Sequence, residues 1–479
     1  MLDRLLARKT DFSADDDHEG PALKRTLGPW GLTALGIGAV IGGGIFVITG
    51  QAAAEHAGPA IVLAFVIAAL CCSFTALCYA EFATLIPMSG SAYSYAYATL
   101  GEFAAWFIGW NMVLEYGVSA SAVAVSWTGY FTSLLDHLGL HLPPELINAP
   151  LAFQDNRLVV TGALFNLPAV AIVLGLTWLC YIGIRESSGV NLAMVTLKVA
   201  LIVIVIVVGW HYVNPDYWHP FIPQNQGAHK YGWSGIIRGA ALVFFAYIGF
   251  EATSTAAQEA KNPQRDLPIG TLASLAICTV LYIGMAAVLT GLRPFDQLGT
   301  SEPVVTAVAA HPQLGWLRWL VEIGALIGLS SVVLVMIIAQ PRIFMIIGRD
   351  GLLPKVFAKI HPRYRTPHIN TLITGAGIAL LAAVFPLDVL GDLVSMGTLI
   401  AFVAVCMGVI ILRRTQPDLP RTFRVPWAPL TCTLGVLSCL FLLIFGENWY
   451  NWTMMGVWTV IGVAIYFGYG YRHSRLRKT

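Results

Sequence analysis

Long apolar runs dominate the sequence and restrict what the chain can fold into. Because about 20 helical residues cross the hydrocarbon core of a bilayer, apolar runs of about 18 or more residues predict membrane spans. About twelve such runs, bounded by Gly, Pro and charged residues, indicate helices. They start near Trp30, Pro59, Tyr93, Ala163, Gly189, Ser234, Ile269, Leu317, Asn370, Asp388, Trp427 and Tyr450.

The composition agrees with an integral membrane protein. Apolar residues make up 57% and charged residues 11% of the 479 residues, against about 45–50% and about 25% in soluble globular proteins. The net charge of +2, without a single basic cluster, excludes nucleic acid as an expected partner. All eight cysteines lie inside the apolar runs, so neither a disulfide framework nor a zinc site is expected.

The distribution of Lys and Arg predicts the orientation, because positively charged loops are retained on the cytoplasmic side. With the N-terminus inside, the outer loops hold only Arg157, Lys230, Arg293 and Arg318. An even number of spans then places both termini in the cytoplasm.

Two spans contain interruptions that disfavour a continuous helix. Gly42, Gly43 and Gly44 follow one another near the middle of the first span, and each glycine costs about 1 kcal/mol relative to alanine inside a helix. In the sixth span, Gly249 is followed by an aromatic residue and Glu251. Paired interruptions at matching positions of two repeats indicate a binding site near the bilayer midplane.

The glycine run has two other interpretations. A dinucleotide-binding loop requires a preceding strand and a downstream acid, and an apolar helix offers neither. A small-residue packing face explains Gly38 and Gly42, but it leaves Gly43 and Gly44 unexplained.

An interrupted helix exposes unpaired N–H groups at the start of its second half and unpaired C=O groups at the end of its first half. The first set attracts anions and the second attracts cations, so the pair suits a zwitterionic α-amino acid. We expect the amides of Gly42, Gly43 and Gly44 to hold the carboxylate. The carbonyls expected to hold the ammonium group lie near Val40, Ile41, Phe245, Ala246 and Ile248.

Three segments carry a family resemblance that spans nearly the whole chain. They are GIGAVIGGGIFVITG, FFAYIGFEATSTAAQEAKNPQRDLPIG and RIFMIIGRDGLLPKVFAKIHPRYRTPH. The sequence resembles the cationic amino acid transporter branch of the amino acid, polyamine and organocation superfamily. The resemblance implies an all-α membrane protein with an inverted repeat of five plus five helices, as in the leucine transporter, and two additional helices. It also implies amino acid import by alternating access. The family commonly has Ser or Thr where this chain has Gly43.

This architecture divides the chain into five parts. Residues 1–29 form a cytoplasmic segment, 30–212 the first repeat and 234–412 the second repeat, which has the opposite orientation. Residues 427–471 supply the two additional helices, and 472–479 form a cytoplasmic tail. The expected location is the inner (plasma) membrane of a bacterium.

Lys198 is the main candidate for coupling transport to protons. It lies about nine residues into the fifth span, roughly 13 Å along a helix, and an ionisable group at that depth is a functional candidate. The resemblance implies that its ammonium group occupies the place of the sodium ion in related carriers. A structural lysine that caps the first helix remains the alternative. Ser330 and Ser331 in the eighth span are alternative sodium ligands, although Ser in such helices often bonds to its own backbone.

Glu115, Glu251, Arg238 and Glu322 are further charged residues of interest in the predicted spans. Glu115 in the third span either takes part in coupling with Lys198 or is structural. Glu251 either faces a cationic substrate or stabilises the loosened backbone. Arg238 and Glu322 lie near the outer ends of their spans, where we expect them to extend to the interface.

Two residues are candidates for controlling access and specificity. Phe245, beside the second interruption, is expected either to close over the substrate as a gate or to pack in the core. The resemblance places Leu329 near the substrate side chain, and an apolar wall there favours small or medium neutral amino acids. Cationic amino acids or polyamines are the alternative substrates.

The predicted function is therefore proton-coupled symport of amino acids without a cofactor or resident metal. Sodium-coupled transport and exchange are alternatives, and a non-transporting amino acid sensor is the rival class. An enzyme is not expected, because no metal-binding or Ser/His/Asp arrangement occurs in the spans. The expected partners are the amino acid, protons and membrane lipid, with a small helper subunit left open.

Overall fold

The computed structural model describes residues 5–9, 27–86, 90–154, 157–183, 188–227, 229–364 and 366–477. Most of the predicted N-terminal segment 1–29 and the last two residues of the tail lie outside these ranges. Helices dominate the described residues, and a hairpin of β1 (Leu151–Gln154) and β2 (Arg157–Val160) pairs Leu151 with Val160.

The helices follow the order of the apolar runs. The first half of the chain contains α2 (Pro29–Val40), η2 (Gly44–Ile48), α3 (Thr49–Ala52), η3 (Ala53–Ala57), η4 (Gly58–Ala60), α4 (Ile61–Leu85), α5 (Ser91–Thr99), α6 (Glu102–Val113), η5 (Leu114–Val118), α7 (Ser119–His137), η6 (Pro144–Leu146), α8 (Leu167–Tyr181), α9 (Ser188–Trp210) and η7 (Pro215–Trp218). The second half contains α10 (Gly232–Val243), η8 (Phe244–Tyr247), α11 (Ala252–Thr255), η9 (Ala257–Glu259), α12 (Pro263–Leu292), η10 (Phe295–Gln297), α13 (Pro303–Ala309), η11 (Pro312–Leu314), α14 (Gly315–Arg349), η12 (Lys355–Ala358), α15 (His368–Val384), α16 (Leu387–Thr415), α17 (Ala428–Phe445), α18 (Trp449–Ile465), η13 (Tyr466–Gly470), α19 (Tyr471–His473) and η14 (Arg475–Arg477).

Local sequence explains several helix starts. Pro29, Pro263 and Pro303 begin α2, α12 and α13, because proline has no N–H to leave unpaired in a first turn. Asn166 caps α8 by accepting a hydrogen bond from Ala169 N–H at 3.1 Å. The expected start near Tyr93 is wrong for the third long helix, since α5 ends at Thr99 and α6 begins only at Glu102.

Among the described residues, eight helical segments are long and apolar enough to cross a membrane. They are Gly44–Leu85, Leu192–Trp210, Gly232–Thr255, Pro263–Leu292, Pro312–Arg349, Leu387–Thr415, Ala428–Phe445 and Trp449–His473. Pro29–Val40, Leu167–Tyr181 and His368–Val384 are shorter apolar helices. The larger number of about twelve spans and the inverted repeat stay predictions.

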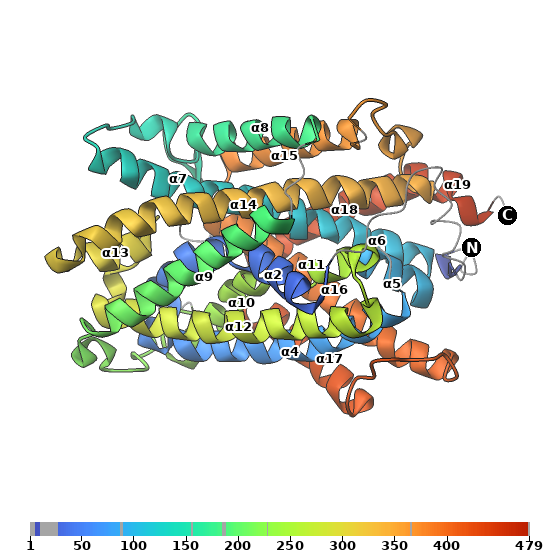
Figure 1. Ribbon diagram of the computed structural model, residues 1–479, viewed down its shortest axis with the longest axis horizontal. Helices are drawn as coiled ribbons and strands as arrows, with labels where there is room; N and C mark the ends of the chain where they lie inside the picture. The colour runs from blue at the N-terminus through green and yellow to red at the C-terminus, as the bar shows by residue number, and fades with distance from the viewer. Residues whose placement is uncertain are drawn as a thin grey trace.

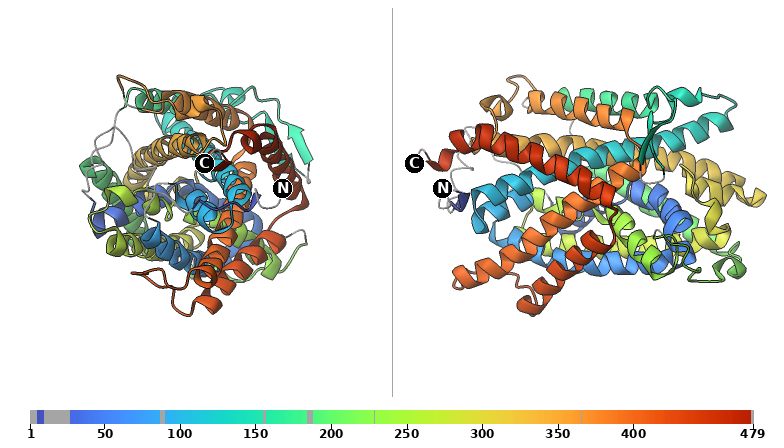
Figure 2. Two further views of the ribbon diagram at one scale, coloured as in Figure 1. Left: turned by 90° about the vertical axis from the view of Figure 1, so that its right-hand side faces the viewer. Right: turned by 180° about the vertical axis from the view of Figure 1, so that it is seen from behind.

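The long helices form a bundle with the short, interrupted segments in its middle (Figure 1). There α2 and α11 lie between α14 on one side and the pair α12 and α4 on the other. Contacts of α12 with α4 and α2, and of α14 with α7, hold this arrangement together. The pair α8 and α15 forms one margin of the bundle, and α17 and α18 extend along another part of its surface (Figure 2).

The two ends of the described chain lie at the same end of the bundle (Figure 1). Lys9 forms an ion pair with Asp350 at 2.9 Å, just after α14. Leu27 forms a parallel bridge with Ala260 and so lies next to the end of η9. The shared side of these two described ends agrees with an even number of crossings between them.

Candidate functional site

The first interruption separates α2 from η2. α2 ends at Val40, and Ile41 adopts an extended conformation with φ −74° and ψ 95°. In the second half of this interrupted helix, Phe46 N–H donates a hydrogen bond to Gly42 O at 3.5 Å. The amides of Gly42, Gly43 and Gly44 lie before this hydrogen bond in the chain. The predicted break is therefore present, and it leaves amides at the start of a helical segment, where anions are favoured.

The second interruption separates α10 and η8 from α11. Ile248 is extended with ψ 131°, and Gly249 has φ +121°, a conformation that residues with a Cβ rarely adopt. The Gly249 N–H donates to both carboxylate oxygens of Glu251, at 2.9 and 3.0 Å. Glu251 thus satisfies the loosened backbone, which corresponds to the second of its two predicted roles.

The two interruptions contact each other directly. A Cβ on Gly44 would lie 2.3 Å from the Cα of Ala246, and a Cβ on Gly249 would lie 2.8 Å from the carbonyl carbon of Ala39. Both neighbouring atoms belong to backbone, so no change of rotamer could make room. Glycine at these positions lets the broken segments approach within van der Waals distance.

Lys198 links α9 to the end of α2. Its side chain is 1% exposed, and its Nζ donates hydrogen bonds to Gly38 O at 2.9 Å and Ile41 O at 3.2 Å. These are carbonyls at the C-terminal end of a helix, where a cation is stabilised by the unpaired C=O groups and the helix dipole. The ammonium group therefore occupies a cation position at the first interruption.

Tyr282 on α12 is a contact that the sequence interpretation missed. Its hydroxyl lies 2.9 Å from Val40 O and 2.8 Å from Ala246 O, and it can donate to either. It therefore bridges the two interrupted segments through carbonyls predicted to hold the substrate ammonium group. The available signal was a tyrosine deep in an apolar span, because a buried hydroxyl usually finds a partner.

Phe245 lies over the glycine run. It is 5% exposed, and its ring approaches within 3.8 Å of the position that a Cβ on Gly43 would take. Ser126 on α7 lies on the same side, with its Oγ 2.6 Å from that position. Gly43 therefore leaves room for Ser126, whose hydroxyl donates to Ala122 O at 3.0 Å.

The other predicted residues on α14 are buried or bonded within the helix. Leu329 is fully buried. Ser330 donates to Leu326 O at 2.7 Å, and Ser331 donates to Gly328 O at 2.9 Å. These bonds are the local pattern that a serine commonly adopts in a helix, and the oxygen atoms can still accept.

Glu115 lies in η5, a π-helical turn between α6 and α7. It is 1% exposed, and both its carboxylate oxygens lack a hydrogen-bond partner within the described part of the chain. Its carboxyl group interacts electrostatically with Glu251. The structure thus brings Glu115 next to the acid of the second interruption.

Arg238 and Glu322 do not extend to the interface as expected. Arg238 is 4% exposed and pairs with Asp392 at 2.6 Å. Glu322 is fully buried and accepts from Arg318 and Ser133 at 2.9 Å. Asp392 and Ser133 lie on other helices, α16 and α7, and periodicity along one helix cannot reveal them, whereas Arg318 lies four residues from Glu322 on α14.

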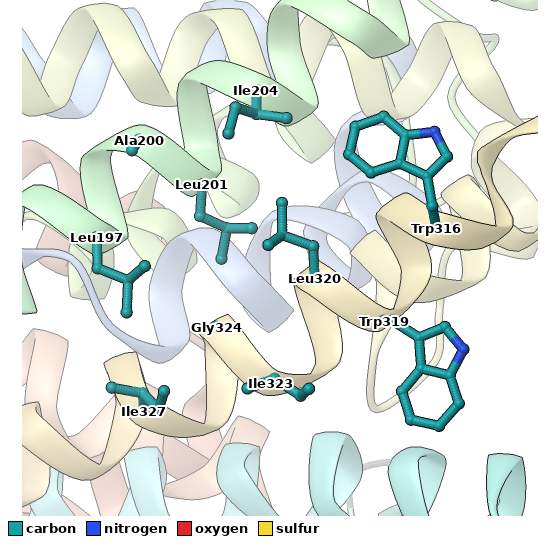
Figure 3. A pocket seen from close by; sticks show the side chains of 10 residues that line it. All are labelled: Leu197, Ala200, Leu201, Ile204, Trp316, Trp319, Leu320, Ile323, Gly324 and Ile327. Carbon is teal, nitrogen blue, oxygen red and sulfur yellow. The ribbon is translucent and has the colours of Figure 1, made fainter.

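A separate apolar groove of about 370 Å³ lies between α9 and α14. Figure 3 shows Leu197 and Ile327 at one end and Trp316 and Trp319 at the other. Its lining is almost entirely apolar, so it does not offer the polar groups that a zwitterion requires. On α9 the groove is lined from Leu197 onward, and Leu197 is adjacent to Lys198 in the sequence.

Comparison with known proteins shows to which family this chain, with its two interrupted helices, belongs. The amino acid permease family matches residues 27–466. The chain belongs to this family. The permease is 47% identical over 457 residues to the branched-chain amino acid permease BcaP of Bacillus subtilis, covering 95% of both chains. It is 44% identical over 477 residues to a methylthioribose transporter of the same organism, covering 100% of both chains.

A plant protein is more distantly similar. The permease is 37% identical over 402 residues to the vacuolar cationic amino acid transporter 4 of Arabidopsis thaliana, covering 84% of the permease and 65% of that protein. The family relationship confirms the predicted resemblance to amino acid transporters. The permease is an integral membrane transport protein for amino acids and is not an enzyme.

Proposed function

We propose that the permease is a secondary active transporter that imports L-amino acids by alternating access. In this proposal about twelve helices cross a bacterial inner membrane, residues 30–212 and 234–412 form inverted repeats, and both termini are cytoplasmic. The observation that carries the proposal is the direct contact between the two interrupted helices, at Gly44 and Ala246. Such paired breaks place amides and carbonyls where a zwitterion can use both.

The substrate carboxylate binds to the amides of Gly42, Gly43 and Gly44. Its ammonium group binds to carbonyls of the second interruption, at Phe245, Ala246 and Ile248, and to Val40 and Ile41 of the first. The hydroxyl of Tyr282 lies within hydrogen-bond distance of both Val40 O and Ala246 O but has one hydrogen to donate, and a carbonyl oxygen has a second lone pair to offer. Substrate and Tyr282 thus share these acceptors.

Small and medium neutral amino acids are the proposed substrates. The main chain holds the groups common to all amino acids, while Phe245 and Leu329 present apolar surface to the side chain. Similarity to the branched-chain amino acid permease BcaP at 47% identity supports this choice.

Coupling to protons is proposed to operate through Lys198 and Glu115. The ammonium group of Lys198 occupies the cation position at the end of α2. Loss of its proton would remove the charge-assisted hydrogen bonds to Gly38 and Ile41, which are among the stronger hydrogen bonds in proteins. α2 would then be free to move when the site opens to the cytoplasm.

Uptake into liposomes tests the function. Purified permease is reconstituted, and accumulation of labelled leucine, alanine and arginine is measured under a pH gradient and, separately, under a sodium gradient. We expect leucine and alanine to accumulate under the pH gradient alone. Faster arginine uptake would overturn the substrate choice, sodium dependence would overturn the coupling, and binding without flux would identify a sensor.

Methylthioribose is the second candidate substrate. It is considered because of the 44% identity to a methylthioribose transporter over the whole chain. Uptake of labelled methylthioribose separates the two, since a methylthioribose carrier should accumulate it and should not be inhibited by leucine or alanine.

A further inference from the structure

A buried ion cluster connects α10 to the C-terminal helices. Arg238 on α10 pairs with Asp392 on α16 at 2.6 Å and with Glu447 at 3.1 Å. Asn451 on α18 donates to Asp392 Oδ2 and Glu447 Oε2, both at 2.7 Å. The side chain of Arg238 also donates to Gly446 O at 3.1 Å.

The charges within this cluster do not balance. One guanidinium faces two carboxylates, although Asp392 and Glu447 are only 4% and 6% exposed. One oxygen of each carboxylate, Asp392 Oδ1 and Glu447 Oε1, lacks a hydrogen-bond partner within the described ranges. An uncompensated charge in such surroundings is strongly unfavourable, and a bound proton removes it.

The surrounding groups do not supply a simple counter-charge. Asp388 and Glu55 add negative charge near Arg238, and Lys230 partly offsets Glu55. The remaining titratable neighbours that face the cluster are His56 on η3, which interacts with Arg238, and Tyr450 on α18, which interacts with Asp388. The net charge therefore stays negative when both Asp392 and Glu447 are ionised.

We propose that the Arg238–Asp392–Glu447 cluster is a second proton-binding site of the permease, with the Glu447 carboxyl group as the acceptor. Glu447 lies in the short connection between α17 and α18, outside the helical segments that are candidates to cross the membrane. In the predicted topology this connection faces the outside. The site is separate from Lys198, which lies on α9.

Electrostatics supports the assignment to Glu447. The pKa of Glu447 is raised to about 8, mainly by burial and also by the neighbouring Asp392, while Arg238 and Asn451 partly lower it. A group with this pKa is about 90% protonated at pH 7 and about 10% protonated at pH 9. The proton is thus bound below about pH 8 and released above it.

Proton binding at Glu447 would act on the second interrupted helix. α10 leads directly into η8, which carries Phe245 and Ala246. With Glu447 protonated, Arg238 pairs with a single charged partner, Asp392. With Glu447 ionised, Arg238 holds two charged partners on separate elements and α10 is tied more firmly to the C-terminal helices. External pH would therefore set how easily α10 moves.

Difference infrared spectroscopy of the full-length permease in lipid, without substrate, tests the site. Protonated carboxyl groups have a C=O stretching band that ionised carboxylates lack. We expect a band that titrates near pH 8 in the wild type and is absent in Glu447→Gln. Asp392→Asn removes the adjacent negative charge and should shift the midpoint to lower pH, whereas Glu145→Gln, on an exposed connection, should leave it unchanged.

Several outcomes would overturn the proposal. They are the absence of any carboxyl band titrating between about pH 7 and 9 in the wild type, an unchanged band in Glu447→Gln, or an unchanged midpoint in Asp392→Asn. If Glu447→Gln does not fold, the midpoint in Asp392→Asn decides. Because the measurement needs no substrate, its result is independent of which solute the permease transports.

Discussion

Gly44→Ala tests the contact on which the proposed substrate site depends. Its Cβ would lie 2.3 Å from the Cα and 2.4 Å from the Cβ of Ala246, where ordinary van der Waals contact begins at 3.4 Å. Since the obstacle is backbone, η2 and η8 must separate by about 1 Å. The variant thus moves the amides of the first interruption away from the carbonyls of the second.

The expected size of the effect follows from two contributions. Overpacking of a dense interior costs about 1–3 kcal/mol of unfolding free energy. Losing one charge-assisted hydrogen bond to the zwitterion costs about 1.5–3 kcal/mol, which corresponds to a roughly 10- to 150-fold weaker Kd. We therefore expect Gly44→Ala to have a lower Tm than the wild type. We also expect it to lose much more substrate affinity than yield of folded protein.

The assay compares Kd for labelled leucine and Tm in the wild type, Gly44→Ala and a matched control. Gly377→Ala in α15 is the control, because a Cβ there meets nothing within 4 Å. Alanine in a helix is favoured over glycine by about 1 kcal/mol, so this variant should keep its Kd and have an equal or higher Tm. A wild-type Kd in Gly44→Ala would refute the reasoning that the two segments must touch for binding.

Three further substitutions separate the roles of neighbouring groups. Lys198→Ala removes the ammonium group from Gly38 and Ile41 and should abolish accumulation driven by a pH gradient; retained accumulation would falsify the coupling role. Phe245→Ala should increase leak and lower steady-state accumulation in liposomes, and unchanged accumulation would mean that the ring only packs. Tyr282→Phe removes the one hydroxyl hydrogen that the Val40 and Ala246 carbonyls can accept, which costs about 1–3 kcal/mol in the empty protein. It should therefore lower Tm and strengthen leucine binding in calorimetry, whereas weaker binding would show that the hydroxyl supports the substrate.

The one-dimensional pattern was sufficient to predict apolar, membrane-length helices and the two breaks, whereas the number of about twelve spans stays a prediction. Apolar runs of membrane length and the glycine-rich segments at Gly42–Gly44 and Gly249 are local signals, because span length and helix propensity depend on consecutive residues. The same pattern pointed to Lys198 as an unusual charge at depth. It misjudged the start of the third long helix, where α5 and α6 are separated by a turn around Gly101.

The partners of buried polar groups could not be predicted from local sequence patterns. Arg238 and Glu322 were expected at the interface, yet Arg238 pairs with Asp392 on α16, and Glu322 accepts from Ser133 on α7 as well as from Arg318 on its own helix. Tyr282 was not predicted from the sequence to be a site residue, although its hydroxyl reaches both interrupted segments. Such contacts depend on how helices distant in the chain are rotated and packed against each other.

By itself the sequence determined that this chain belongs in a membrane, that two of its helices are broken, and that a basic group lies near one break. Only the tertiary structure decided that Gly44 and Ala246 meet, that Lys198 reaches the carbonyls of Gly38 and Ile41, and that Arg238 joins two acids from other segments. The physical reason is the separation along the chain over which each kind of interaction acts. Hydropathy and helix propensity act along neighbouring residues, whereas hydrogen bonds and ion pairs form between atoms that only the packed fold brings within about 3 Å.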